Sequence, residues 1–183
     1  MTASRTILVG GGARSGKSRF ALGYARRLGA RRAFVATAEG LDEEMRERIA
    51  RHRQERGDSF ATLEAPVELP GALAELDAEV VVIDCLTLWL SNLLVAGMAP
   101  AAIEERVEAL AAVLARRRFH ALVVSNEVGL GLVPETPLGR AFRDLAGWAH
   151  QRLARAADEI YLAAMGIVLR VHPAPVERAP EWT

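Results

Sequence analysis

Cysteine, excess charge and uninterrupted hydrophobic runs are all scarce in this sequence, and each shortage excludes a class of protein. The single cysteine, Cys85, rules out an internal disulfide framework and fits a reducing compartment. The 23 Lys and Arg residues balance 23 Asp and Glu residues, which gives no support for nucleic-acid binding or for a patch that binds anionic membranes. The longest apolar stretch, residues 80–103, is interrupted by Asp84, Gly97 and Pro100. A buried strand followed by a helix is therefore favoured over a membrane span.

Length and composition favour one cytoplasmic α/β domain. The 183 residues are 51% hydrophobic and 25% charged, which suits a globular domain with its own core. The first residues enter a strand pattern directly, without the basic and then apolar pattern of a signal peptide. We expect a single domain over residues 1–172 and a flexible tail over residues 173–183, where three prolines occur.

Lysine is also scarce, and its one occurrence marks the central motif. Of the 23 Lys and Arg residues only Lys17 is a lysine, and it lies in the pattern Gly-x-x-x-x-Gly-Lys-Ser between a strand pattern and a helical one. Glycines let backbone N–H groups turn inward around a phosphate, and the following helix adds the positive end of its dipole. Lys17 is expected to reach the β- and γ-phosphates and Ser18 to place its hydroxyl on Mg²⁺. The sequence therefore predicts that a nucleoside triphosphate is bound by Gly11, Gly12, Ala13, Arg14, Ser15, Gly16, Lys17 and Ser18.

Apolar runs alternate with amphipathic segments along the rest of the chain. Strands are expected at residues 6–10, 33–38, 60–65, 80–84, 121–125, 159–164 and 167–171, and helices at 18–28, 42–56, 67–76, 86–95, 101–118 and 137–157. This alternation predicts a mostly parallel sheet with helices on both faces, ending in a small hairpin around Gly166. Ligands of such sheets bind at the carboxyl ends of the strands.

Two residues outside the loop are candidates for chemistry. Asp84 ends an apolar strand, as a Walker B carboxylate does, and is expected to hold Mg²⁺; the alternative is that it caps the helix beginning at Leu86. His52 continues the expected inner face of the helix at 42–56, which carries Ile49. A neutral imidazole is a good nucleophile toward phosphorus, but a half-buried histidine on a salt-bridged helix fits the same pattern. Cys85 is expected to be a packed thiol rather than a nucleophile.

The segment 125–135 is rich in glycine and leaves a strand at the same edge of the sheet. It is long enough to be a lid over a ligand, although a capping turn explains the same residues. Glu127 and Glu135 are its candidate acids. Arg14 and Arg19 flank the lysine and are further candidates for phosphate contact, Arg19 being equally suited to the surface.

Several blocks taken together resemble one family, the bifunctional adenosylcobinamide kinase and adenosylcobinamide-phosphate guanylyltransferase of cobalamin biosynthesis. The matching blocks extend over about residues 6–171, and the most specific are Asn126-Glu127-Val128-Gly129 and Phe142-Arg143-Asp144-Leu145-Ala146-Gly147. The others are residues 11–18, Ala36-Thr37-Ala38, the helix from Glu44 to Arg53, Val82-Ile83-Asp84-Cys85-Leu86-Thr87, Val133-Pro134-Glu135 and Gln151-Arg152-Leu153-Ala154.

The resemblance implies a RecA-like P-loop fold, a homotrimer and two reactions. The first phosphorylates the aminopropanol hydroxyl of adenosylcobinamide with ATP or GTP. The second transfers GMP from GTP to that phosphate through a guanylylated histidine, which maps to His52, and releases pyrophosphate. Beyond the loop, the nucleotide contacts of the family map to Ala36, Thr37, Ala38, Arg53, Gln54, Glu55, Arg56, Glu64 and Asp84.

The sequence departs from the family pattern at two positions near the mapped histidine. Gly57 stands where many relatives have proline, and Arg51 stands where some have a second histidine. Trp89, Trp148 and residues 126–137 are candidates for contact with the corrinoid. Two other hypotheses stay open: a P-loop kinase of another small alcohol that forms no guanylylated histidine, and a nucleotide-dependent switch protein.

Overall fold

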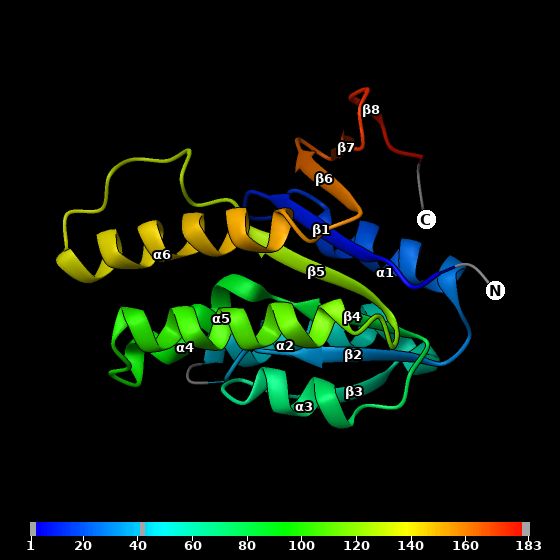
Figure 1. Ribbon diagram of the computed structural model, residues 1–183, viewed down its shortest axis with the longest axis horizontal. Coiled ribbons are helices and arrows are strands. Elements are labelled where there is room, and N and C mark those ends of the chain that lie inside the picture. The colour runs from blue at the N-terminus through cyan, green and yellow to red at the C-terminus, as the bar shows by residue number, and fades with distance from the viewer. Residues whose placement is uncertain (1–2, 41–42, 181–183) are drawn as a thin grey trace.

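The computed structural model describes residues 3–40 and 43–180 (Figure 1). Within this range the described side chains do not include those of Glu44, Met45, Arg48, Arg51, His52, Glu55 and Arg56. The strands are β1 (Thr6–Gly11), β2 (Arg32–Ala36), β3 (Ala61–Glu64), β4 (Val80–Asp84), β5 (His120–Asn126), β6 (Glu159–Ala164), β7 (Ile167–His172) and β8 (Glu177–Arg178). The helices are α1 (Lys17–Leu28), α2 (Glu43–Arg56), α3 (Leu69–Glu75), α4 (Leu86–Val95), α5 (Pro100–Ala115) and α6 (Pro137–Ala154), with a 3₁₀ turn at Gly57–Ser59.

All described strands belong to one sheet, in the order β3-β2-β4-β5-β1-β6-β7-β8. The pairs from β3 to β6 are parallel, and β7 and β8 add antiparallel strands at one edge. The strand β5 therefore lies between β1, which carries the glycine-rich loop, and β4, which ends in Asp84. The predicted mostly parallel sheet with a small C-terminal hairpin is confirmed.

Helices cover both faces of the sheet, and the strand sequences show why. Along β4 every residue from Val80 to Ile83 is fully buried, with Val81 and Ile83 facing one core and Val80 and Val82 facing the other. The first core packs against α3, α4, α5 and α6, and the second packs against α1. A strand buried on both faces needs a continuous apolar run rather than an alternating one.

Some element ends differ from the predicted ones for identifiable reasons. The strand predicted at residues 33–38 ends at Ala36, because the N–H of Thr37 turns to Asp84 O, 3.3 Å away, and its hydroxyl bonds to Cys85. The helix predicted to reach residue 118 ends at Ala115, since Arg117 takes a left-handed conformation (φ 54°) on the way to β5. The hairpin at Met165 and Gly166 has positive φ at both residues, as a tight two-residue turn requires.

Residues 177–179, within the segment predicted to be a flexible tail, make backbone hydrogen bonds to β7. Glu177 and Arg178 pair with β7, and Ala179 is buried and donates its N–H to Val168 O at 2.7 Å. The domain limits themselves stay a prediction.

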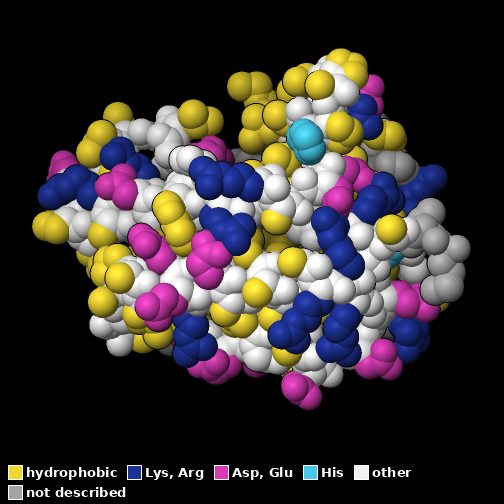
Figure 2. All heavy atoms as spheres, viewed as in Figure 1, with side chains coloured by type: hydrophobic (Ala, Val, Ile, Leu, Met, Phe, Trp, Pro, Cys, Tyr) yellow, Lys and Arg dark blue, Asp and Glu magenta, His cyan; other side chains and the backbone are white. Residues whose placement is uncertain are grey.

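Positive and negative side chains are interspersed on the face shown in Figure 2, in keeping with the zero net charge. Among the described residues, no helix has the length and apolar character that crossing a bilayer would require.

Candidate functional site

The glycine-rich loop between β1 and α1 has a backbone that few other residues permit. Gly11 and Gly16 have φ of 153° and 93°, and Arg14 lies in the left-handed region at 56°. A Cβ added at Gly11 would lie 2.4 Å from Ala163 O, closer than atoms can approach. Gly16 is the N-cap residue of α1, and it has no side chain that could accept a hydrogen bond from the helix. The first N–H groups of α1 therefore lie next to the loop without a side-chain cap from Gly16. Such N–H groups are suited to bind a phosphate.

Two buried polar side chains lie inside this loop. Lys17 is only 6% exposed and its Nζ donates to Gly12 O at 3.0 Å, so the ammonium is folded back into the loop. The hydroxyl Oγ of Ser15 is buried and has no hydrogen-bond partner among the described groups. A buried cation and a buried donor in one loop favour an anionic ligand.

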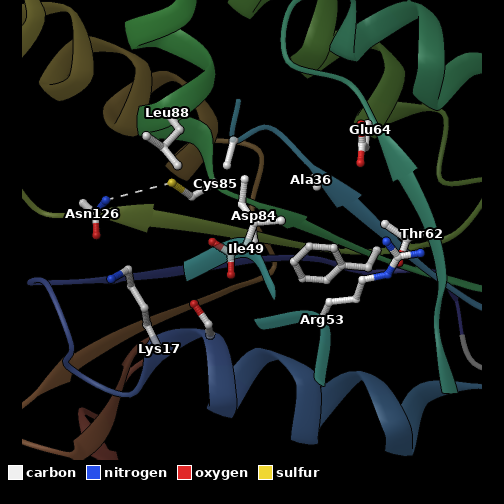
Figure 3. A pocket seen from close by; sticks show the side chains of 13 residues that line it. Lys17, Ala36, Ile49, Arg53, Thr62, Glu64, Asp84, Cys85, Leu88 and Asn126 are labelled. Atoms are coloured by element: carbon white, nitrogen blue, oxygen red, sulfur yellow. Dashed lines mark hydrogen bonds between the residues drawn. The ribbon is translucent and has the colours of Figure 1, made fainter. Parts of the chain in front are cut away.

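The loop forms one end of a cleft that encloses about 720 Å³, part of it open to solvent. Figure 3 shows Lys17 and Asn126 at this end, Asp84 near the middle, and Arg53, Thr62 and Glu64 at the other end. The cleft is lined by Lys17, Ser18, Phe34, Ala36, Ala38, Ile49, Arg53, Thr62, Glu64, Asp84, Cys85, Leu88 and Asn126. A charged end beside an elongated, partly apolar end has the shape and chemistry that a nucleotide requires.

Asp84 faces the cleft rather than the helix behind it. The N-cap of α4 is Cys85, and no side-chain cap is formed there within the described chain, so the alternative that Asp84 caps α4 is wrong. Ser18, in the first turn of α1, lines the same cleft. One hydroxyl and one carboxylate suit Mg²⁺, which takes few protein ligands and completes its shell with phosphate oxygens and water. The described residues contain no cluster of three His, Cys, Asp or Glu side chains that would hold a metal without such a ligand.

Thr37 and Cys85 hold the floor of the cleft together. Thr37 is fully buried, its Oγ1 accepts from Cys85 N at 2.7 Å, and it donates to Cys85 O at 2.7 Å. Burial, and secondarily the charge of Asp84, raises the pKa of the Cys85 thiol to about 11. The thiol is therefore protonated near neutral pH, and its burial agrees with the prediction of a packed cysteine.

The structure places the predicted site residues at different positions relative to the cleft. Lys17, Ser18, Ala36, Ala38, Arg53, Glu64 and Asp84 line the cleft, and Gly11, Gly12, Ala13, Arg14, Ser15 and Gly16 form the loop at its end. Thr37 lies beneath the surface, and Gln54 is exposed on α2 and does not line the cleft. His52, Glu55 and Arg56 lie on α2, but their side chains are outside the described set.

Sequence reasoning missed several residues of the cleft. Thr62 lies two residues before Glu64 on β3, and strand periodicity alone places both on one face. Asn126 ends β5 at the same edge of the sheet as Asp84; the sequence placed it in the segment that leaves a strand there but gave it no role toward the nucleotide. Phe34 and Leu88 carry no signal that separates them from core residues.

The loop that follows β5 is tied to the phosphate loop and to α6. Glu127 N donates to Gly11 O at 3.0 Å, and Glu127 Oε1 accepts from Gly129 N at 2.6 Å. His150 of α6 lies behind it, with Nε2 2.6 Å from Ser125 Oγ and Nδ1 3.9 Å from Glu127 Oε2. Burial lowers the pKa of His150 although Glu127 opposes the shift, so the ring is neutral at pH 7. Figure 1 shows the loop reaching out from β5 to the start of α6.

Of the two tryptophans considered for corrinoid contact, one is excluded. Trp89 is fully buried and its Nε1 donates to Val67 O at 2.8 Å, so it belongs to the core and that hypothesis was wrong for this residue. Trp148 is half-buried, and Leu130, Leu132 and Val133 of the loop are largely exposed.

The family model for cobinamide kinase / cobinamide phosphate guanyltransferase matches residues 7–171. The chain is 40% identical over 175 residues to the bifunctional adenosylcobalamin biosynthesis protein CobP of Pseudomonas aeruginosa, an alignment that covers 94% of this chain and 98% of that protein. It is 37% and 38% identical to the bifunctional adenosylcobalamin biosynthesis proteins CobU of Escherichia coli and Salmonella typhimurium, covering 90% of this chain and 98% of each relative.

A solved structure supports the fold. The RadB recombinase superposes with a TM-score of 0.53 at 17% identity, covering 99% of this chain and 84% of that one. At this identity the likeness concerns the fold alone, and it agrees with the predicted RecA-like P-loop architecture.

Proposed function

The chain belongs to the cobinamide kinase and cobinamide phosphate guanyltransferase family, and on that premise we propose that it catalyses two successive reactions on adenosylcobinamide. The first uses ATP or GTP to phosphorylate the aminopropanol hydroxyl. The second transfers GMP from GTP to the new phosphate and gives adenosylcobinamide-GDP and pyrophosphate. The observation that carries the proposal is a cleft lined by Lys17, Ser18 and Asp84, with Lys17 at one end and Arg53 and Glu64 at the other.

In the first reaction the substrate hydroxyl oxygen bonds to the γ-phosphorus while the bond between that phosphorus and the β-bridging oxygen breaks. The products are a nucleoside diphosphate, the phosphorylated alcohol and a proton. Lys17 and the N–H groups at the start of α1 are suited to stabilise the charge on the transferring and leaving oxygens. The buried position of Lys17 strengthens this interaction, because water does not screen it.

In the second reaction we propose that a ring nitrogen of His52 attacks the α-phosphorus of GTP and releases pyrophosphate. The phosphate of the substrate then attacks the phosphorus of the guanylylated histidine and frees the imidazole. Splitting one difficult displacement into two is the usual benefit of a covalent intermediate. His52 follows Ile49 by three residues and precedes Arg53 on α2, and both of these neighbours line the cleft.

Ser18 and Asp84 are the residues that would hold Mg²⁺, since both line the cleft and Ser18 directly follows Lys17 at the start of α1. When bound, this ion withdraws charge from the phosphate oxygens and helps to fix their positions. At the far end, the Glu64 carboxylate offers acceptors to the N–H groups of guanine, and Phe34 offers an apolar surface to the base. We further propose, from the family resemblance, that the protein is a cytoplasmic homotrimer.

Covalent labelling with GTP that is radioactive at the α-phosphorus tests the proposal. Wild-type protein is expected to retain a label that acid removes and base does not, and His52→Ala is expected to retain none. Guanylyl transfer should fall at least about a thousandfold, or roughly 4 kcal/mol of transition-state stabilisation. His172→Ala is the control, because His172 is exposed at the end of β7 and should label normally.

Other outcomes select the other hypotheses. A wild type that phosphorylates a small alcohol but never becomes labelled would be a kinase without guanylylation. If the wild type binds GTP but consumes neither ATP nor GTP in the presence of adenosylcobinamide, the protein would be a nucleotide-dependent switch.

A further inference from the structure

The carboxyl end of β5 places a side-chain carbonyl in the cleft that the two proposed reactions do not use. Asn126 lines the cleft, and its Oδ1 is buried without a hydrogen-bond partner among the groups that the structure describes. Its other polar groups are engaged. The main-chain N and Nδ2 donate to Thr87 Oγ1 at 3.2 and 3.1 Å, and Nδ2 also lies 3.9 Å from Cys85 Sγ.

In the structure this network turns the amide nitrogen of Asn126 toward Thr87. Thr87 is 2% exposed in the first turn of α4, where packing restricts the rotation of its side chain. Thr87 Oγ1 accepts both donors of Asn126 and lies 3.3 Å from Cys85 Sγ, to which it can give its own proton. Among the nitrogen and oxygen atoms of this network, Asn126 Oδ1 is then the one without a partner in the described chain. Figure 3 shows the amide nitrogen toward Cys85 and the oxygen on the side where Lys17 lies.

The sheet holds Asn126 at the phosphate end of the cleft. Asn126 is the register partner of Gly11, and the next residue, Glu127, donates its N–H to Gly11 O at 3.0 Å. The carbonyl is thus attached to the strand that carries the phosphate loop, and it does not depend on the exposed part of the loop 127–136.

The chemistry of a carbonyl limits what can meet Asn126 Oδ1. An amide oxygen accepts hydrogen bonds and gives none, and phosphate oxygens are acceptors too, so a triphosphate alone leaves it unpaired. A ligand that satisfies it must bring a donor to the phosphate end. In the proposed phosphorylation that donor is the hydroxyl group that receives the γ-phosphoryl group.

We propose that Asn126 Oδ1 accepts a hydrogen bond from the alcohol to be phosphorylated and thereby turns a lone pair of its oxygen toward the γ-phosphorus. This inference rests on the proposed function. An amide does not take up the proton, so Asn126 orients the nucleophile and leaves deprotonation to other groups. Guanylylation of the enzyme from GTP involves no alcohol, and therefore Asn126 serves one of the two reactions only.

The test compares the two reactions in Asn126→Ala. The value of kcat/KM for phosphorylation of adenosylcobinamide is expected to fall about tenfold to a hundredfold, the loss of one well-placed hydrogen bond. The yield of α-phosphorus label from GTP, and the Kd of a fluorescent GTP analogue, are expected to stay within about twofold of wild type. Thr87→Val is the second variant. It keeps the Asn126 carbonyl but removes the hydroxyl that orients it, so kcat/KM for phosphorylation should fall by less than in Asn126→Ala.

The contrary outcomes are distinct. An equal loss of phosphorylation and labelling in Asn126→Ala, with the protein folded, would mean that the carbonyl meets Lys17 or a metal-bound water, and it would overturn the proposal. Unchanged phosphorylation in both variants would also overturn it. If Asn126→Ala does not fold, Thr87→Val becomes the test. The proposal then requires that Thr87→Val phosphorylates adenosylcobinamide more slowly than wild type but is labelled by GTP to the same extent. Failure of the wild type to phosphorylate would instead refute the proposed function.

Discussion

Gly11 is the residue at which the phosphate loop depends most directly on close packing. Its φ of 153° is unfavourable for other residues, and an added Cβ would collide with Ala163 O at 2.4 Å and Ser15 Oγ at 2.7 Å. We expect Gly11→Ala to lower the free energy of unfolding by about 2–4 kcal/mol, because β6 must move to admit the methyl group.

Gly12→Ala is the matched control, since a Cβ there meets nothing within 4 Å. It should change the free energy of unfolding by less than about 0.5 kcal/mol. Urea unfolding of both variants measures the difference, and equal stabilities would contradict the packing argument.

Residue roles that depend on local chain geometry were predictable, and those that depend on burial were not. The spacing of Gly11, Gly16 and Lys17 specifies a phosphate loop wherever it follows a strand, and the structure has that loop. Nothing in the spacing of Trp89 tells an apolar ligand contact from a core side chain, and the structure buries it completely. Thr37 was likewise mapped as a nucleotide contact, but in the structure it is fully buried and its hydroxyl bonds to Cys85.

At the scale of elements, the start of α6 depends on a cap that ends the long loop. Thr136 Oγ1 accepts from Gly139 N at 3.1 Å, and Pro137 occupies the first helical position. Thr136→Ala removes this acceptor and is expected to cost about 1 kcal/mol, which would lower the Tm by roughly 2–4 °C in a chain of this size. Thr136→Ser keeps the acceptor and should melt with wild type. A Thr136→Ala variant as stable as the serine variant would show that the cap contributes nothing.

The elements with the clearest sequence patterns were predicted best. The β-branched run Val80–Ile83 and the helix α4 were found with their bounds, because neither permits another secondary structure that buries the same side chains. Helix ends were less accurate. The end of α5 is decided by the turn through Arg117 that brings His120 into register with Val80, and this is a tertiary requirement.

At the scale of the whole molecule, the alternation of strands and helices predicted the parallel sheet but not the order of its strands. The order places β5 between β1 and β4, and so brings Asn126 into the cleft beside Gly11. No local pattern specifies that neighbour relation, so the sequence placed Asn126 at this edge of the sheet without assigning it a role beside the phosphate loop. The sequence predicted that the side of α2 carrying Ile49 faces inward, and in the structure Ile49 lines the cleft.

Asp158 joins the start of β1 to Arg117, which precedes β5. This contact makes the free energy of unfolding depend on pH. Asp158 Oδ2 accepts from Thr6 N at 2.6 Å and pairs with Arg117, which also donates to Ser4 O. Burial alone would raise the pKa of Asp158, but the bonds from Arg117 and Thr6 outweigh it and lower the pKa below its ordinary value of 3.8. A depressed carboxyl pKa stabilises the folded state above the unfolded-state pKa, and this contribution disappears as the pH falls through the lower, folded-state value.

Asp158→Asn keeps the shape of the side chain and an acceptor for Thr6 N but removes the charge. Because the carboxylate is about a third exposed and solvent screens the pair, we expect a loss of only about 1 kcal/mol at pH 7. Wild type and variant should converge in free energy of unfolding as the pH falls below about 4. Asp77→Asn is the control, since Asp77 is 83% exposed and its pair with Arg31 should contribute almost nothing at any pH. Urea unfolding from pH 7 down to the acid limit of the fold measures both, and a difference that persists undiminished at the acid end would show that Asp158 acts through its shape and not its charge.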